Sequence, residues 1–203
     1  IVRMTWTSSQ PNHPFGEYAY KTLKYRRMVT VGQDYAFGWE NVGGLLRTFE
    51  AAGGQVVQQV WAPIGTADYG PYVGQIRRDV DAVYVLLVGA DIPRFFKAYK
   101  DFGLKGKIPL IGGNIVTDED VLKHMGDEAL GVITSHTYSA ALVRPENVKF
   151  VEAFQKRYGK MPSYYAEGMY TAALWLDRAL KVTGLPTDGR TIYVALGKFQ
   201  AAV

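Results

Sequence analysis

The sequence predicts an α/β protein with a doubly wound parallel sheet, followed by helices that have no sheet of their own. From residue 28 to residue 136, five short apolar runs alternate with amphipathic helical patterns, as in a parallel sheet with helical crossovers. The runs are rich in valine, isoleucine and leucine, which is typical of strands that are covered on both faces. After residue 138 only helical patterns follow.

The five predicted strands cover residues 28–32, 55–63, 81–89, 107–113 and 130–136. Two helices between them are predicted from apolar stripes at helical spacing. The stripe of the helix over 39–52 is Trp39, Val42, Leu46 and Phe49. The stripe of the helix over 92–102 is Ile92, Phe95, Phe96, Tyr99 and Phe102. We expect Gly53 to end the first helix in a left-handed conformation and Asp91 to cap the second.

Local signals also predict the remaining helices. Thr117 and Asp120 resemble a capping box, with aspartate in the usual place of Glu or Gln, and predict a helix over 118–125. A proline in the first turn and a closing glycine mark the first of the C-terminal helices. These helices are predicted over 145–159, 163–184 and 187–199.

The helix over 163–184 has an apolar face that requires a partner surface. This face consists of Tyr165, Met169, Ala172, Trp175 and Leu176. We expect the C-terminal helices to cover a second sheet whose strands this chain does not contain. An independent helical bundle is the alternative.

The composition is ordinary for a soluble globular protein and excludes several kinds of site. The chain has 203 residues, of which 48% are hydrophobic and 21% charged, with a net charge of +4 and no cysteine. Disulfides, thiolate zinc sites and cysteine nucleophiles are therefore excluded. No apolar run approaches the roughly 18 residues of a membrane helix. The chain opens in IVRMTW without a start methionine, which suggests a mature or trimmed product.

The one basic cluster is interpreted as a solvated helix end rather than as a nucleic-acid patch. It consists of Lys21, Lys24, Arg26 and Arg27.

Ligands of open parallel sheets bind beyond the carboxyl ends of the strands. The loops at these ends are 33–38, 89–92 and 113–118. The first loop, GQDYAFG, lacks the closely spaced glycines and the lysine of a phosphate loop, and Asp34 would repel a phosphate. Tyr35 can stack on a ligand and hydrogen-bond through its hydroxyl. For Tyr35 and Phe37, packing across the helix entry is the alternative.

Catalytic signatures are absent from the sequence. It has no GxSxG elbow, no HExxH motif and no histidines at metal-ligand spacing, and its carboxylates form no obvious acid/base pair. Of the three histidines, only His136, at a strand exit, has a plausible site position. We therefore expect no enzyme, no cofactor and no metal, with an enzyme of unrecognised site as the alternative.

Four stretches occur in collinear order: VTVGQDYAFGWENVGG from residue 29, DAVYVLLVGADIPRFF from residue 81, MGDEALGVITSHTYSAAL from residue 125 and PENVKFVEAFQKRYG from residue 145. Together they resemble the periplasmic solute-binding proteins of ABC importers, of the branched-chain amino acid (Leu/Ile/Val-binding) type. The resemblance implies a type 1 fold, in which three crossing segments join two α/β lobes with doubly wound parallel sheets and the ligand lies between the lobes.

The resemblance also implies a division of the chain. Residues 1–14 would form a crossing segment or hinge, and residues 15–137 the second, C-terminal lobe. Residues 138–203 would contain another crossing segment and helices of the first lobe. The family's N-terminal portion has no counterpart here, so we expect a nearly complete second lobe and a partial first lobe.

Candidate ligand-binding residues follow from the resemblance. Tyr35 falls on the family's cleft tyrosine, and Val88 and Gly89 fall where relatives contact the ligand after the third strand. Further candidates in the presumed crossing segments, for which hinge packing is the alternative, are Trp6, Gln10, His136 and Tyr138.

One position departs from the family pattern. Asn114 falls where amino-acid binders place an acid for the substrate's ammonium group. A neutral amide lacks the charge-assisted hydrogen bond, which is worth about 1.5–3 kcal/mol. Either Asp34 or Asp91 substitutes for the acid, or the ligand is not an α-amino acid.

The resulting hypothesis is an extracytoplasmic solute-binding protein, periplasmic or anchored as a lipoprotein. It would close by a hinge motion around an amino acid or an aromatic or other organic acid and deliver it to a membrane permease. The expected partners are this small-molecule ligand and the ABC importer permease, without nucleic acid, and the protein is expected to be a monomer. The alternative is the ligand-sensing domain of a regulator or receptor with the same fold.

Overall fold

The computed structural model describes residues 3, 5–113, 115–184 and 188–198. Its centre is a five-stranded parallel sheet with the strand order β2-β1-β3-β4-β5. The strands are β1 (Arg27–Gln33), β2 (Gln55–Ala62), β3 (Ala82–Leu86), β4 (Leu110–Gly112) and β5 (Ile133–Thr134). The predicted α/β class with a parallel sheet is therefore confirmed.

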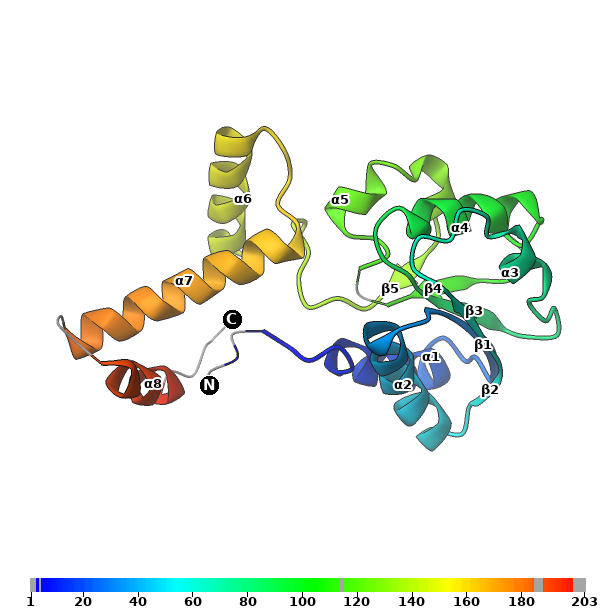
Figure 1. Ribbon diagram of the computed structural model, residues 1–203, viewed down its shortest axis with the longest axis horizontal. Helices are drawn as coiled ribbons and strands as arrows, with labels where there is room; N and C mark the ends of the chain where they lie inside the picture. Colours follow the sequence, from blue (N-terminus) through cyan, green and yellow to red (C-terminus); the bar gives the residue numbers. More distant parts are fainter. Residues whose placement is uncertain (1–2, 4, 114, 185–187, 199–203) are drawn as a thin grey trace.

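Helices cover both faces of the sheet, as a doubly wound fold requires (Figure 1). One face carries α1 (His13–Lys21) and α2 (Ala36–Ala51). The other face carries α3 (Gly70–Gly74), α4 (Asp91–Asp101) and α5 (Glu119–Leu122). Two short 3-10 helices complete this part, η1 (Gln10–Asn12) and η2 (Gly126–Ala129). We call residues 10–134 the sheet body.

The chain reverses its direction across the sheet between β1 and β3. β2 lies on one side of β1, whereas β3, β4 and β5 follow on the other side. In doubly wound sheets, ligands bind outside the carboxyl ends of the strands at such a switch point. The loops after β1 and β3 are therefore the place where the fold favours a site.

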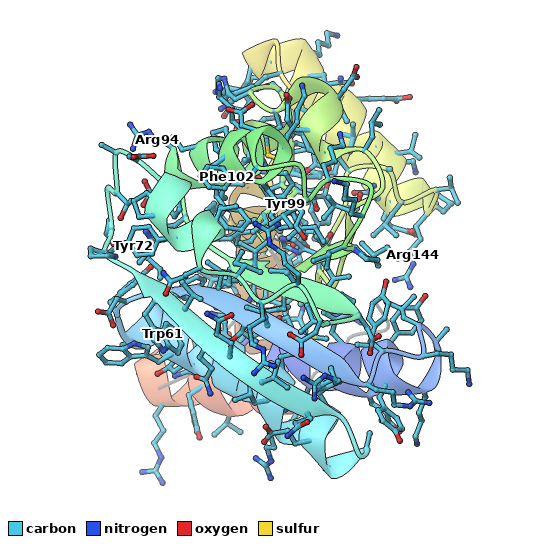
Figure 2. All side chains as sticks on the ribbon, turned by 90° about the vertical axis from the view of Figure 1, so that its right-hand side faces the viewer. Trp61, Tyr72, Arg94, Tyr99, Phe102 and Arg144 are labelled. Atoms are coloured by element: carbon cyan, nitrogen blue, oxygen red, sulfur yellow. The ribbon has the colours of Figure 1, made fainter. Side chains whose placement is uncertain are left out.

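The two central strands form the dry interior. The residues from Met28 to Gln33 in β1 and from Ala82 to Leu86 in β3 are all buried, as the continuous apolar runs predicted. Tyr99 of α4 lies between its helix and the sheet (Figure 2), where its hydroxyl donates a hydrogen bond to the carbonyl oxygen of Ile108 at 3.0 Å. The outer strands β4 and β5 are shorter than the predicted runs, 107–113 and 130–136.

Two of the predicted apolar stripes need correction. α2 begins at Ala36, three residues earlier than predicted, and its buried face includes Val42, Leu45 and Phe49. Trp39 is 52% exposed and does not belong to this face. In α4 the predicted stripe is buried as far as Tyr99, but Phe102 follows the end of the helix and is exposed.

Two predicted caps are also wrong. The residue before α4 is Ala90, and Asp91 is already part of the helix. The cap of α5 is Asp118, whose side chain accepts a hydrogen bond from the backbone N–H of Asp120. The hydroxyl of Thr117 instead shares a hydrogen bond with the hydroxyl of Thr134 in β5, at 2.7 Å.

The C-terminal helices stand apart from the sheet body (Figure 1). They are α6 (Pro145–Tyr158), α7 (Tyr164–Thr183) and α8 (Gly189–Lys198). As predicted, α6 has its proline in the first turn and ends at Gly159, which has a left-handed φ of 68°. α7 packs on α8, and the ring of Tyr170 in α7 stacks on Phe150 of α6 with 4.6 Å between the centroids.

Much of the predicted apolar face of α7 is not covered by the described residues. Tyr165 is 67% exposed, Met169 74% and Leu176 45%. The proposal that this face covers a second sheet is consistent with its exposure but stays a prediction. The predicted lobe boundaries, 1–14, 15–137 and 138–203, stay predictions as well.

Candidate ligand-binding site

The loops at the switch point are held together by two buried polar side chains. Gln33, at the end of β1, has no exposed surface. Its Nε2 donates to Oδ2 of Asp91 at 2.5 Å, and its Oε1 accepts from the backbone N–H of Val88 at 2.7 Å. Oδ2 of Asp91 also accepts from the backbone N–H of Gly65 at 2.8 Å. The loops after β1, β2 and β3 are therefore connected by buried hydrogen bonds.

Gly38 explains the second glycine of the GQDYAFG loop. A Cβ atom at this position would lie 1.9 Å from the carbonyl oxygen of Gln33. The glycine thus allows the first turn of α2 to approach the end of β1, rather than providing backbone amides for a phosphate. This close approach fixes where α2 begins.

Tyr35 projects from the residue that precedes α2. Its backbone is extended, with φ −163° and ψ 175°, and its half-buried ring lies 6.0 Å from the ring of Phe37. Burial raises the pKa of the Tyr35 phenol, and the nearby phenol of Tyr165 in α7 raises it further. Tyr35 therefore packs on its own helix entry and also lies near the first turn of α7.

The other candidates in these loops have structural partners. Asp34 is exposed and accepts a hydrogen bond from Nε1 of Trp39 at 3.1 Å. Asp91 is 2% exposed, and both carboxylate oxygens are used, since Oδ1 pairs with Nη1 of Arg94 at 3.2 Å. The N–H of Val88 is bound to Gln33.

Three candidates remain to be placed. Gly89 is exposed with a left-handed φ of 56°. Gln10 is exposed, and its Oε1 accepts from the backbone N–H of Thr7 at 2.7 Å, which stabilises the turn before η1. Asn114 lies outside the described residues.

Three aromatic rings from distant parts of the chain meet where the sheet body joins the C-terminal helices. We call Trp6, His136 and Tyr164 the junction cluster. The centroids of the His136 and Tyr164 rings lie 4.8 Å apart. The centroid of the Trp6 ring lies 5.6 Å from that of Tyr164 and 6.3 Å from that of His136. The ring centroids of Tyr164 and Tyr165 lie 3.9 Å apart, and Tyr165 is also close enough to Tyr35 to raise the pKa of its phenol. The cluster and the switch-point tyrosine therefore occupy one neighbourhood.

His136 has an unusual hydrogen-bonding state. Its Nδ1 accepts from the backbone N–H groups of Thr137 at 2.9 Å and Tyr138 at 3.2 Å. Its Nε2 is buried and has no partner among the described residues. Burial lowers the pKa of the imidazole to about 4, so the ring is neutral at pH 7.

Tyr138 lies deeper in the same segment. It is 7% exposed, and its ring faces Phe150 of α6 at 6.5 Å. Its hydroxyl is also buried without a partner in the described part of the chain. Burial raises the pKa of this phenol, and the charges of Glu119 and Glu167 add to the rise.

Asp118 joins the sheet body to α7 and was not among the predicted residues. It is 5% exposed, and its Oδ2 accepts from the backbone N–H of Tyr164 at 3.1 Å, while Oδ1 accepts from that of Asp120. Burial raises the pKa of its carboxyl group. One carboxylate thus caps two helices that start 45 residues apart. Sequence gives no signal for such a long-range cap.

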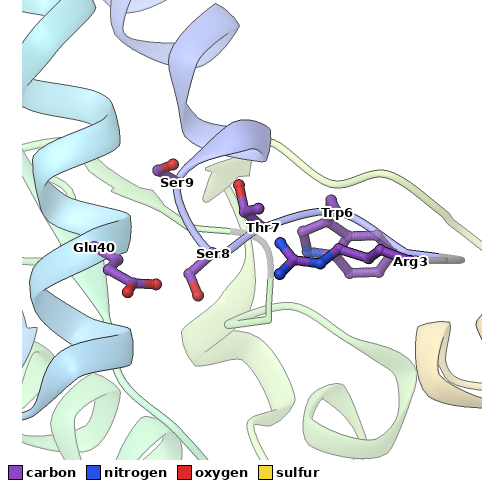
Figure 3. A pocket seen from close by; sticks show the side chains of 6 residues that line it. All are labelled: Arg3, Trp6, Thr7, Ser8, Ser9 and Glu40. Atoms are coloured by element: carbon purple, nitrogen blue, oxygen red, sulfur yellow. The ribbon is translucent and has the colours of Figure 1, made fainter. Parts of the chain in front are cut away.

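A hollow of about 590 Å³ adjoins the junction cluster. Figure 3 shows Arg3 and Trp6 at one end and Glu40 of α2 at the other. Thr7, Ser8 and Ser9 complete its lining. The hollow is polar, whereas the junction cluster is aromatic, and Trp6 belongs to both. Tyr35 and His136 do not line this hollow.

Neither a metal-ion site nor a membrane-spanning helix is found in the described part of the chain. The described residues contain no group of three or more His, Cys, Asp or Glu residues that could hold a metal ion. Among the described helices, none is both long and apolar enough to cross a membrane.

Comparisons with known proteins agree on one family. A family model described as periplasmic binding protein matches residues 1–200. A Leu/Ile/Val-binding protein homolog 6 from Brucella melitensis is 31% identical over 194 residues, which cover 93% of this chain and 49% of that protein. The chain thus spans about half the length of the curated relatives that it matches.

Solved structures show the same fold. An ABC transporter substrate-binding protein from Sphaerobacter thermophilus matches with a TM-score of 0.91 and 36% identity, covering 96% of this chain and 54% of that one. A solute binding protein from Rhodopseudomonas palustris BisB5, in complex with 3,4-dihydroxy benzoic acid, matches with a TM-score of 0.86 and 34% identity, with the same coverage. The predicted family and its type 1 fold are therefore confirmed.

Proposed function

Because this chain belongs to the periplasmic binding protein family, we propose that it serves as the extracytoplasmic solute-binding component of an ABC importer. The ligand would be a small carboxylate-bearing molecule held between the sheet body and the C-terminal helices. Members of this family bind solutes, and no bond is made or broken in the proposed role. The family also supports a periplasmic or lipid-anchored location.

The observation that carries this proposal is the junction cluster. Its three rings come from the N-terminal segment, the segment after β5 and the start of α7. A ligand in contact with these rings would touch α7 and, at the same time, the two chain segments that lead into and out of the sheet body. Such a ligand stabilises the closed arrangement because it binds that arrangement more tightly than the open one. The closed form would then dock on the membrane permease.

Within the carboxylate class, the site favours an aromatic acid over an amino acid. An amino acid brings an ammonium group, which needs an acceptor when it loses water. Both carboxylate oxygens of Asp91, one of the predicted acceptors, already have partners, which are Gln33, Gly65 and Arg94. A planar ring, by contrast, can stack against Trp6, Tyr164 or Tyr35. The bound aromatic acid in the 34% identical relative supports the same choice.

Titration calorimetry of the full-length protein tests this function. The panel consists of benzoate, 4-hydroxybenzoate and 3,4-dihydroxybenzoate, with leucine, isoleucine and valine as the competing class. We expect saturable binding of at least one aromatic acid and weaker binding of the amino acids. Tight binding of the amino acids alone would reject the aromatic class, and no binding of any small acid would reject the transport role.

A further inference from the structure

We propose that His136 determines ligand specificity, by donating a hydrogen bond from its Nε2–H to an oxygen of the bound aromatic acid. The oxygen belongs either to the carboxylate or to a ring hydroxyl. This inference rests on the proposed function and names the atom that would recognise the ligand. Three features carry it: the tautomer of the ring, the missing acceptor and the surrounding rings.

The backbone fixes the tautomer of His136. Two N–H groups, those of Thr137 and Tyr138, point at Nδ1, at 2.9 and 3.2 Å. An atom that accepts hydrogen bonds cannot carry the proton of a neutral imidazole, so the proton lies on Nε2. The lowered pKa of the ring, caused by burial, agrees with this neutral form. Nε2 is therefore a hydrogen-bond donor.

This donor has no acceptor in the described part of the chain. Nε2 is buried without a partner, and the rings that pack on His136 are those of Tyr164 and Trp6. Aromatic faces are only weak acceptors. Buried donors without a partner are rare in native structures, and each one calls for a partner from outside or for a functional reason. An oxygen of the ligand supplies that partner.

The neighbours of His136 define the kind of ligand that brings this oxygen. The half-buried Trp6 ring packs on the buried Tyr164 ring, with 5.6 Å between the centroids, and its flat aromatic surface favours a planar ligand. Trp6 belongs to a segment without regular secondary structure and also lines the polar hollow. Trp6 therefore contacts both the hollow and the His136 ring.

Two substitutions separate the functions of the two ring nitrogens. His136→Asn keeps an acceptor oxygen near the position of Nδ1, and so preserves the turn, but has no donor at the position of Nε2. His136→Gln places an amide near Nε2 and loses the local acceptor. We expect His136→Asn to weaken binding of the aromatic acid about tenfold or more, with little change in the thermal midpoint. His136→Gln should retain more of the affinity and less of the stability.

Calorimetry of the full-length protein with the three benzoates gives the first measurement. Equal loss of affinity for all three in His136→Asn assigns the hydrogen bond to the carboxylate. Loss for the two hydroxylated acids alone assigns it to the ring hydroxyl. Both results support the inference, and unchanged affinity for all three overturns it. Failure of the unsubstituted protein to bind any benzoate overturns the proposed ligand class as well.

Nuclear magnetic resonance of protein labelled with 15N-histidine gives the second measurement. A hydrogen bond to the ligand should move the His136 Nε2 proton downfield on addition of the acid, whereas hinge packing alone should leave it in place. The signals of the exposed His124 provide the internal control.

Discussion

α4 and α7 are both amphipathic helices, and their different surroundings show what an apolar stripe does and does not define. In α4, Phe95 has no exposed surface because the helix lies on the central sheet. In α7, Met169 is 74% exposed although it occupies the predicted apolar face. An amphipathic pattern thus shows that a helix needs a partner surface. It does not say which part of the protein supplies that surface.

The largest expected effect tests this contrast directly. Phe95→Ala should lower the free energy of unfolding by about 3–5 kcal/mol, because it leaves a cavity beneath α4. Met169→Ala in the same 203-residue chain should change it by no more than about 0.5 kcal/mol, since its side chain is exposed. Urea unfolding of both variants measures the difference. Equal losses would show that α7 buries this residue in solution and would remove the contrast.

A smaller effect is expected at the switch point, where the sheet body is most tightly built. Gly38→Ala places a methyl group against the carbonyl oxygen of Gln33 and should cost about 1–3 kcal/mol. It should also weaken ligand binding, because Tyr35 lies at the displaced turn. Gly43→Ala is the matched control on the same helix, since a Cβ atom there meets nothing within 4 Å.

For the control we expect a gain of about 0.5–1 kcal/mol from the better helix propensity of alanine. Thermal or urea unfolding measures both variants, and titration calorimetry measures their ligand affinity. If the Gly38→Ala variant were as stable as the Gly43→Ala variant, residue 38 would not lie against the carbonyl oxygen of Gln33.

The smallest effect concerns the link between the two regions. Asp118→Ala removes the acceptor of the Tyr164 and Asp120 N–H groups and should cost about 1–2 kcal/mol. Asp120→Ala is its neighbouring control. Oδ1 of Asp120 pairs at the surface with Lys123 at 3.2 Å and with Lys160, which follows α6, at 3.7 Å, and each such exposed pair is worth at most about 1 kcal/mol.

Near-ultraviolet circular dichroism gives a further readout for this pair, because it reports the packing of the aromatic side chains, which include Trp6 and Tyr164. We expect a changed spectrum in Asp118→Ala and an unchanged one in Asp120→Ala. If neither variant altered the spectrum, Asp118 would not position α7 against the sheet body.

The sequence predicted those elements whose signals are local. The apolar runs predict β1 and β3 correctly, because strands that are covered on both faces consist mostly of apolar residues. α6 was bounded by Pro145 and Gly159, each of which acts through its own backbone geometry. The start of α2 was placed three residues late, because it depends on the approach of Gly38 to Gln33, which no local pattern encodes.

The ligand-binding roles of the candidate residues stay predictions, but the places of some of these residues in the fold could be predicted from local signals. Tyr35 and His136 follow strand ends, and strand ends can be located from sequence. Their neighbours Tyr164 and Asp118 could not be predicted, because they reach the site from segments far away in the chain. The partners of Asp91 could not be predicted either. Its Oδ2 accepts hydrogen bonds from Gln33 and Gly65 and is therefore not free to bind a ligand.

By itself, the sequence determined the order of strands and helices, the parallel sheet and the family, since these depend on periodicity and on collinear motifs. Only the tertiary structure decided which polar groups are satisfied and which are not. The reason is physical: a hydrogen bond is made between atoms about 3 Å apart, and the chain brings such atoms together without regard to their distance in sequence. The buried Nε2 of His136, which has no hydrogen-bond partner among the described residues, and the Asp118 carboxylate, which accepts from two helix starts, are seen only in the tertiary structure.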